Sequence, residues 1–258
     1  MKFAIPTCAV AALLAAAPAL AADEPAKAES PWTVTANVAL TNAYFFRGLN
    51  YTRERPAVQG GFDISHSSGF YVGTWASNVD SNAFPNANSE IDVYGGFAKE
   101  FGGFLVDVGV LQFLYPSGQV FNTTEVYGGV TWGMLNVKYS HAVTEYFGVG
   151  GTKDSGYIEG NLNYEVLPSW VLNLHAGHQN VVNVGDLSFT QYRAGITKNF
   201  DGGWSVSLQG IAIDAKNKDF LVDYGCGGSP NPAHNAQLTG TCKSVMDLPY
   251  QITVKRVF

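Results

Sequence analysis

Apolar and polar residues alternate one by one through most of this chain, and no apolar run beyond its first residues is long enough for a membrane helix. The stretch "YQITVKRVF" illustrates the pattern, because Tyr250, Ile252 and Val254 fall on one face and polar residues stand between them. A period of two is typical of a half-buried β-strand. A membrane span needs about 20 consecutive apolar residues as a helix. The pattern therefore excludes a helical membrane protein and predicts strands that each bury one face.

The alternation recurs in an even number of segments. For residues 70–77 the two faces cannot be told apart from the sequence, whereas elsewhere one face is clearly apolar. We predict twelve strands at 32–41, 58–64, 70–77, 91–97, 104–110, 126–132, 135–139, 158–164, 170–176, 192–196, 204–208 and 250–254.

The connections alternate in length as regularly as the residues alternate in polarity. Short turns are expected at 66–69, 100–103, 133–134, 167–169 and 200–203, and longer links at 48–55, 78–89, 115–122, 144–155, 179–188 and 215–247. Hairpins with short turns at one end and long loops at the other are typical of outer-membrane barrels. A β-sandwich also uses short alternating strands. It does not require strands of a membrane's thickness, about 9–11 residues, with aromatic residues near their ends.

Seven aromatic residues lie near the predicted strand ends, as the interfacial girdles of a barrel require: Trp32, Tyr44, Phe46, Phe104, Trp132, Trp170 and Trp204. The charged fraction of 14% is low for a soluble surface, where about 25% is usual. We therefore predict an all-β fold, a transmembrane up-and-down antiparallel barrel of about twelve strands. Its short turns would be periplasmic and its longer loops extracellular.

The first residues have the features of an export signal. Met1-Lys2 is followed by an apolar, small-residue stretch, and Ala19-Leu20-Ala21 offers a cleavage site. We predict a signal peptide at 1–21, a periplasmic N-terminal tail at 22–31 and an outer-membrane barrel at 32–258. Cys8 would leave with the signal peptide.

Two cysteines remain in the exported chain, and both lie in the longest link. Cys226 and Cys242 are predicted to form a disulfide, which is the default in an oxidising compartment. Such a bridge restrains a loop by about 3 kcal/mol in the chain-entropy model.

The last strand is expected to pair with the first, because an open strand edge in lipid leaves unpaired backbone groups. The ending is similar to the C-terminal signature that the barrel-assembly machinery of bacterial outer membranes recognises, with Tyr250, Ile252, Val254 and Phe258 as the matching residues. Arg256 departs from that signature. An outward arginine near the interface costs only about 0–1 kcal/mol.

Most of residues 32–258 also resemble a known family, the TorF family of porins. The resemblance rests on "LTNAYFFRGLNYTRERPAVQGGFDIS", "SGFYVGTWASNVD" and "EIDVYGGFAKEFGGFLVDVGVLQFLYP". It implies an outer-membrane barrel with channel activity, and it supplies no catalytic residues.

If the aliphatic residues face lipid, strand parity points the charged residues of the strands into the lumen. Seven acids and four bases are then predicted to line it: Arg47, Asp63, Glu90, Asp92, Asp107, Glu125, Lys138, Glu159, Glu165, Arg193 and Lys255. Because lumen residues tune selectivity, this excess of acids favours cations slightly. The alternative is that these charges pair and plug the barrel.

Other chemical signals are weak. His175 and His178 stand three apart on a strand and so face opposite sides, which argues against a metal pair. Ser140 and His141 are adjacent and face opposite sides as well, and "FGVGG" at 147–151 has no following helix to bind a dinucleotide. We expect no cofactor and no metal. The formal net charge of −6 gives no sign of a nucleic-acid partner.

The sequence thus predicts a non-enzymatic outer-membrane channel for passive diffusion of ions or small hydrophilic solutes. Its expected partners are outer-membrane lipids, the barrel-assembly machinery and the solute, and a homo-oligomer is left open. An outer-membrane lipid hydrolase on a similar barrel and a non-conducting structural or adhesion barrel remain the alternatives.

Overall fold

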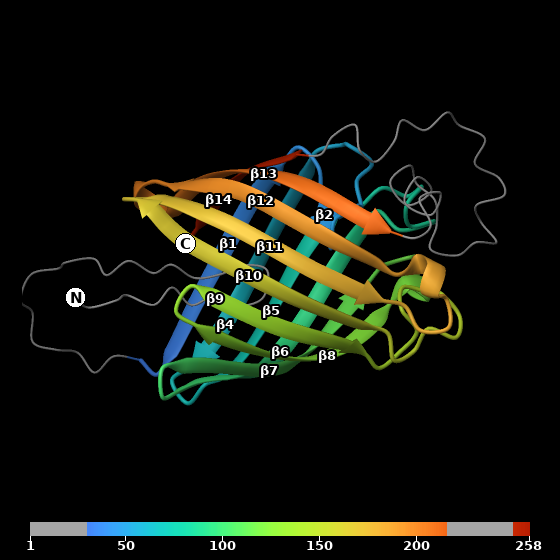
Figure 1. The fold of residues 1–258 in the computed structure, drawn as a ribbon, viewed down its shortest axis with the longest axis horizontal. Coiled ribbons are helices and arrows are strands. Elements are labelled where there is room, and N and C mark those ends of the chain that lie inside the picture. The colour runs from blue at the N-terminus through green and yellow to red at the C-terminus, as the bar shows by residue number, and fades with distance from the viewer. Residues whose placement is uncertain (1–29, 216–249) are drawn as a thin grey trace, which may run out of the picture.

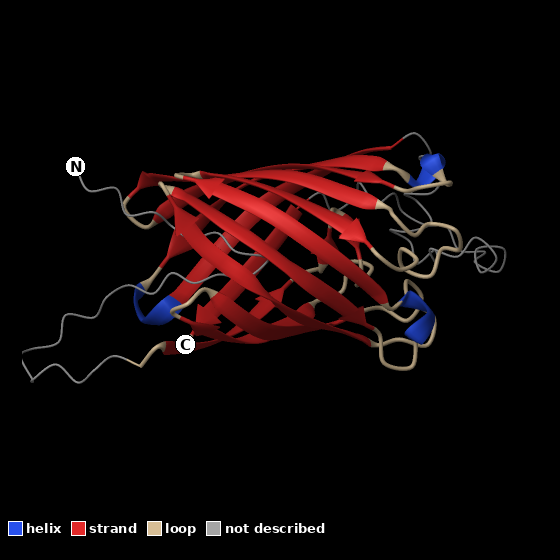
Figure 2. Cartoon of the chain, turned by 90° about the horizontal axis from the view of Figure 1, so that it is seen from below, coloured by secondary structure: helices blue, strands red, loops and turns tan. Residues whose placement is uncertain are grey.

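The computed structural model describes residues 30–215 and 250–258, which form one closed antiparallel barrel of twelve strands. Figures 1 and 2 show the tilted strands wrapping into a cylinder, with the longer loops gathered at one end. The strands are β1 (Trp32–Thr41), β4 (Ala57–His66), β5 (Phe70–Asn78), β6 (Ser89–Phe101), β7 (Phe104–Leu114), β8 (Thr123–Trp132), β9 (Leu135–Ala142), β10 (Gly156–Leu167), β11 (Trp170–Asn180), β12 (Phe189–Asn199), β13 (Trp204–Ala215) and β14 (Tyr250–Val257). The predicted fold class is confirmed.

Each strand pairs with its neighbours along the chain, and β14 pairs with β1 to close the sheet. At this seam the register runs from Asn37 opposite Val257 to Thr41 opposite Thr253. The backbone N–H of Phe258 also donates to the carbonyl of Ala36 at 2.9 Å. All twelve strands are therefore paired along both edges, which is what a sheet in an apolar medium needs.

The two faces of the barrel differ in polarity because side chains alternate along every strand. On β11 the side chains of Leu174, Ala176 and His178 are exposed on the outer wall, and those of His175 and Gln179 are buried in the interior. The outer wall carries large exposed apolar residues such as Val34, Val58 and Val137. The structure also settles the facing of residues 70–77.

On β5 the inward side chains are Tyr71, Trp75 and Ser77, whereas Phe70 and Val72 are exposed outside. Both faces of this strand carry aromatic and small residues, so the sequence pattern did not separate them.

The connections sort into two ends, as the sequence predicts. The short-turn end joins β4 to β5, β6 to β7, β8 to β9, β10 to β11 and β12 to β13, and the last of these holds the short 3-10 helix η3 (Asp201–Gly203). The long-loop end carries the other described connections, with η1 (Gln119–Phe121) and η2 (Gly185–Leu187). In the described residues no helix has the length and apolar character needed to cross a membrane.

One element was not predicted. Within the connection from β1 to β4, the short strands β2 (Phe45–Phe46) and β3 (Leu49–Asn50) form a separate two-stranded hairpin. Its turn is Arg47-Gly48, and both residues have positive φ, at 47° and 84°. This is the type I′ pattern that fits a two-residue hairpin, and glycine is favoured there. The predicted signal peptide and the predicted disulfide of Cys226 and Cys242 lie outside the described residues.

Candidate channel lumen

The β2–β3 hairpin folds into the barrel, and its Arg47 side chain reaches the opposite wall. The guanidinium donates to both carboxylate oxygens of Glu125 on β8, at 2.9 and 2.7 Å, and to Gln179 Oε1 on β11 at 2.9 Å. In the closed strand order, β8 and β11 each lie four or more strands away from β1. The hairpin therefore spans the lumen rather than lying against β1 and β4, the barrel strands that it connects.

The ion pair is buried, and aromatic rings surround it. Arg47 is 8% exposed and Glu125 is 2% exposed. The guanidinium lies 4.8 Å from the ring centroid of Phe46 and 4.3 Å from that of Tyr157. Bidentate arginine–carboxylate pairs are among the stronger and more specific charged contacts. This pair fixes the hairpin across the bore.

Aromatic residues from several loops and from β7 pack around the hairpin at the long-loop end. Phe46 lies 5.4 Å from Phe113 and 5.7 Å from Phe147, measured between ring centroids, and Tyr51 lies 4.6 Å from Phe84. We call this set the aromatic plug; its members are Tyr44, Phe46, Tyr51, Phe84, Phe113, Tyr115, Phe121 and Phe147. Burial of so much ring surface makes this end of the barrel a compact core.

Glu90 lies fully buried beside the aromatic plug and accepts two tyrosine hydroxyls. Tyr44 donates at 2.6 Å, and Tyr115 donates to the other oxygen. Burial, together with the neighbouring Glu90, raises the pKa of both tyrosine hydroxyls well above its ordinary value. Both hydroxyls therefore keep their protons and remain donors.

The loop that carries Phe147 is fixed by its own backbone. The carboxylate of Glu145 accepts the N–H of Thr152 at 2.7 Å and that of Lys153 at 3.2 Å. The bond from the Thr152 N–H is the main cause that lowers the pKa of Glu145. The loop thus presents Tyr146 and Phe147 to the plug in a defined conformation.

A cavity of about 320 Å³ lies beneath the hairpin. Six of the predicted lumen residues line it: Arg47, Asp92, Asp107, Lys138, Glu159 and Arg193. Aromatic side chains of the plug form one part of its wall, and the amides of β9 and β10, among them Asn136 and Asn163, form another.

Tyrosines hold two of the predicted acids. Tyr94 donates to Asp63 at 2.5 Å, and Tyr71 donates to Asp107 at 2.6 Å. Tyr127 in turn hydrogen-bonds Tyr71. These tyrosines were not predicted as lumen residues. The parity that points the acids inward applies to Tyr94 and Tyr127, whereas Tyr71 lies on β5, whose facing the sequence pattern leaves open.

The remaining predicted residues are more dispersed. Lys138 lies 4.5 Å from the ring centroid of Tyr127, and Glu159 lies 3.6 Å from His175 Nδ1. Glu165 is exposed at the short-turn end, where it accepts the Ser169 N–H at 2.9 Å. Lys255 is half-buried on β14, opposite Ala39. The structure thus brings Arg47 and Glu125 together and leaves Glu165 apart.

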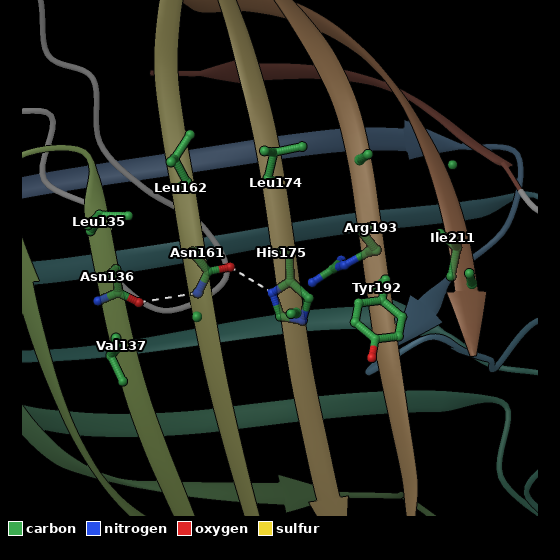
Figure 3. A pocket seen from close by; sticks show the side chains of 15 residues that line it. Leu135, Asn136, Val137, Asn161, Leu162, Leu174, His175, Tyr192, Arg193 and Ile211 are labelled. Carbon is green, nitrogen blue, oxygen red and sulfur yellow. Dashed lines mark hydrogen bonds between the residues drawn. The ribbon is translucent and has the colours of Figure 1, made fainter. Parts of the chain in front are cut away.

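Hydrogen bonds between polar side chains run across β9, β10 and β11 (Figure 3). Asn161 donates to Asn136 at 3.2 Å, and its oxygen lies 2.7 Å from His175 Nδ1. His175 Nε2 also lies 2.6 Å from Gln191 Nε2. His178 is exposed on the other face of β11, so the two histidines do not meet. Among residues 30–215 and 250–258, no three His, Cys, Asp or Glu side chains gather in a way that could hold a metal ion.

Figure 3 also shows the outer side of the same strands. Leu162 and Leu174 point away from Asn161 and His175, and they border a shallow apolar depression on the outer wall together with Tyr192. These strands therefore present polar side chains to the interior and apolar side chains to the outside.

Comparison with known proteins gives one family match. A family model described as "Bacterial protein of unknown function (Gcw_chp)" matches residues 25–241. No curated protein matches. The resemblance to the TorF family stays a prediction beside this match.

Several solved barrels are similar in fold. The KdgM porin has a TM-score of 0.52 and 9% identity, over 88% of this chain and 99% of that chain. The KdgM porin in complex with disordered oligogalacturonate has a TM-score of 0.50 and 8% identity, over 88% and 98%. The NanC porin has a TM-score of 0.48 and 8% identity, over 87% and 98%. At such identities the likeness to KdgM concerns the fold alone.

Proposed function

Because this chain belongs to the Gcw_chp family of bacterial proteins of unknown function, we propose its function from the barrel itself: an outer-membrane channel for passive diffusion of ions or small hydrophilic solutes. The barrel would lie in the bacterial outer membrane after export with cleavage of the predicted signal peptide. The long-loop end would face outward and the short-turn end would face the periplasm.

The observation that carries the proposal is the opposite polarity of the two faces of a closed sheet. The outer wall is apolar, with Val38, Val108 and Leu208 among its exposed residues. The interior carries charged and amide side chains around a cavity. A closed barrel with an apolar outside and a polar inside suits a bilayer, since every backbone group is paired and polar solutes meet only the lumen.

The hairpin sets the size of the solute. A barrel of twelve strands is wider than an eight-stranded barrel, whose interior is filled by side chains. In this barrel the β2–β3 hairpin crosses the wider bore. The remaining cavity of about 320 Å³ suits a small molecule rather than a polymer. One KdgM structure holds oligogalacturonate. That acidic solute does not suit this chain, because acids outnumber bases among its predicted lumen residues.

A second candidate is a closed, non-conducting barrel with a structural or adhesive role. The aromatic plug and the buried Arg47–Glu125 pair favour it, since both fill the long-loop end.

The other alternative is a lipid hydrolase. Ser140 is buried inside, while the neighbouring His141 contacts Asp154 at 3.3 Å. Those two residues do not form a catalytic pair.

Conductance of the purified, folded protein in planar bilayers tests the proposal. We expect discrete conductance steps and, in a KCl gradient, a reversal potential that indicates a slight cation preference. Folding would be checked first by the shift in electrophoretic mobility on heating. If the folded barrel inserts without conducting, the channel is contradicted and the closed, non-conducting barrel is favoured.

A further inference from the structure

One acid of the lumen cavity has a free oxygen. Asp92 on β6 is 9% exposed, and its Oδ1 is buried without a hydrogen-bond partner among the described residues. It lines the cavity beneath the hairpin. Burying a carboxylate oxygen without a hydrogen-bond donor costs free energy. A ligand that brings a donor to this oxygen would remove that cost.

Aromatic side chains flank the same carboxylate. Trp75 on β5 and Phe113 on β7 stand directly opposite Asp92 in the two neighbouring strands. Tyr44 lies 5.3 Å from Trp75, and Phe46 lies 5.4 Å from Phe113, between ring centroids. All four rings line the cavity together with Asp92. The acid thus lies in a box of aromatic side chains.

The base of the hairpin is already paired. Arg47 is held by both oxygens of Glu125. Within the described residues no lysine, arginine or histidine nitrogen lies within 4.0 Å of the Asp92 carboxylate, while Glu90 stands two residues away on the same inward face. The part of the lumen around Asp92 therefore holds two acids and, among the described residues, no base in contact with either, and a positively charged ligand would complement them.

We propose that this cavity binds a primary alkylammonium ion, with its N–H group donating to Asp92 Oδ1 and its carbon chain lying against Trp75 and Phe113. Cations bind the faces of aromatic rings, most strongly that of tryptophan, and such boxes recognise organic ammonium groups. A charge-assisted hydrogen bond adds specificity. The inference rests on the proposed channel, because the site lies in the path of a solute, and it names the class of solute.

A bare metal ion fits the site less well. Calcium takes six to eight oxygen ligands, and the rings of Trp75, Phe113 and Phe46 offer none. Sodium would likewise exchange its water shell for carbon surface. An alkylammonium ion matches both halves of the site, the oxygen and the rings.

Isothermal titration of the purified full-length barrel in detergent tests the site, with ethylammonium chloride as the probe and sodium chloride at equal ionic strength as the reference. We expect saturable binding of ethylammonium. Asp92→Asn should weaken it by about tenfold or more, the value of a hydrogen bond to a charged group. Trp75→Phe, which keeps a smaller ring, should weaken it less. The matched control is Glu100→Gln, an exposed acid at the other end of β6 that does not line the cavity, and it should bind as the unmodified protein does.

The outcomes separate the two proposals. Absence of ethylammonium binding, or binding equally tight in Asp92→Asn, would overturn the ammonium site even if the barrel conducts. If Asp92→Asn does not fold, equal binding by Trp75→Phe and the unmodified protein would overturn it instead. Binding by a barrel that does not conduct would overturn the channel and leave the site in place.

Discussion

At the scale of single residues, Arg47 decides where the β2–β3 hairpin lies. The two oxygens of Glu125 hold its guanidinium, and both side chains are almost fully buried. Arg47 also adopts a positive φ of 47°, a conformation that costs a residue with a side chain about 1–2 kcal/mol. The contacts across the lumen offset this strain.

The first prediction therefore concerns Glu125→Gln. Removing one partner of a buried ion pair costs about 3–5 kcal/mol, because the other charge is left uncompensated. We expect the hairpin to leave the lumen and the single-channel conductance in planar bilayers to rise.

The matched control replaces both partners, as Arg47→Met with Glu125→Leu. A buried pair exchanged for apolar residues of similar volume is often neutral in stability, so the hairpin should stay and the conductance should remain low. Equal conductance of the unmodified protein and Glu125→Gln would show that the pair does not hold the obstruction.

At the scale of elements, the barrel strands and the hairpin differ in how far the sequence predicts them. A strand such as β11 alternates over eleven residues, and its outward and inward sides follow from that pattern alone. The strands β2 and β3 have two residues each, too few for any period. The prediction treats Arg47 as a strand residue, whereas it lies in the turn of this hairpin, and its partner Glu125 lies 78 residues away in the chain. That contact depends on barrel closure, which no local pattern contains.

The second prediction removes the hairpin. Tyr51 N–H donates to the Tyr44 carbonyl at 2.8 Å, so the ends of the segment 45–50 already meet, and Asn-Gly can replace it. No ladder of the barrel contains these residues. We expect a folded barrel with higher conductance than the unmodified protein in planar bilayers. The same Asn-Gly replacement of Gly133-Met134, in a turn at the opposite end, should leave the conductance as it is. An unchanged conductance without the hairpin would mean that the rest of the aromatic plug closes the bore.

At the scale of the whole molecule, closure of the sheet is the property on which all others depend. β14 pairs with β13 from Gly210 opposite Tyr250 to Trp204 opposite Arg256, and its other edge pairs with β1. This single strand therefore satisfies the backbone groups of two edges. In a bilayer each unsatisfied group costs several kcal/mol.

The last prediction is that deletion of residues 250–258 prevents the barrel from forming. β1 and β13 would each keep an unpaired edge, and the apolar outer wall would no longer enclose a polar interior. We expect the truncated chain to show no mobility shift on heating and to be degraded by protease in membranes. Arg256→Ala is the control, because it keeps every backbone bond of the seam and removes only a side chain that lies 5.3 Å from the ring centroid of Trp204; it should fold. A heat-modifiable, protease-resistant truncated chain would mean that β13 can pair with β1 directly. The closed sheet would then tolerate eleven strands, and β14 would not be the strand that determines closure.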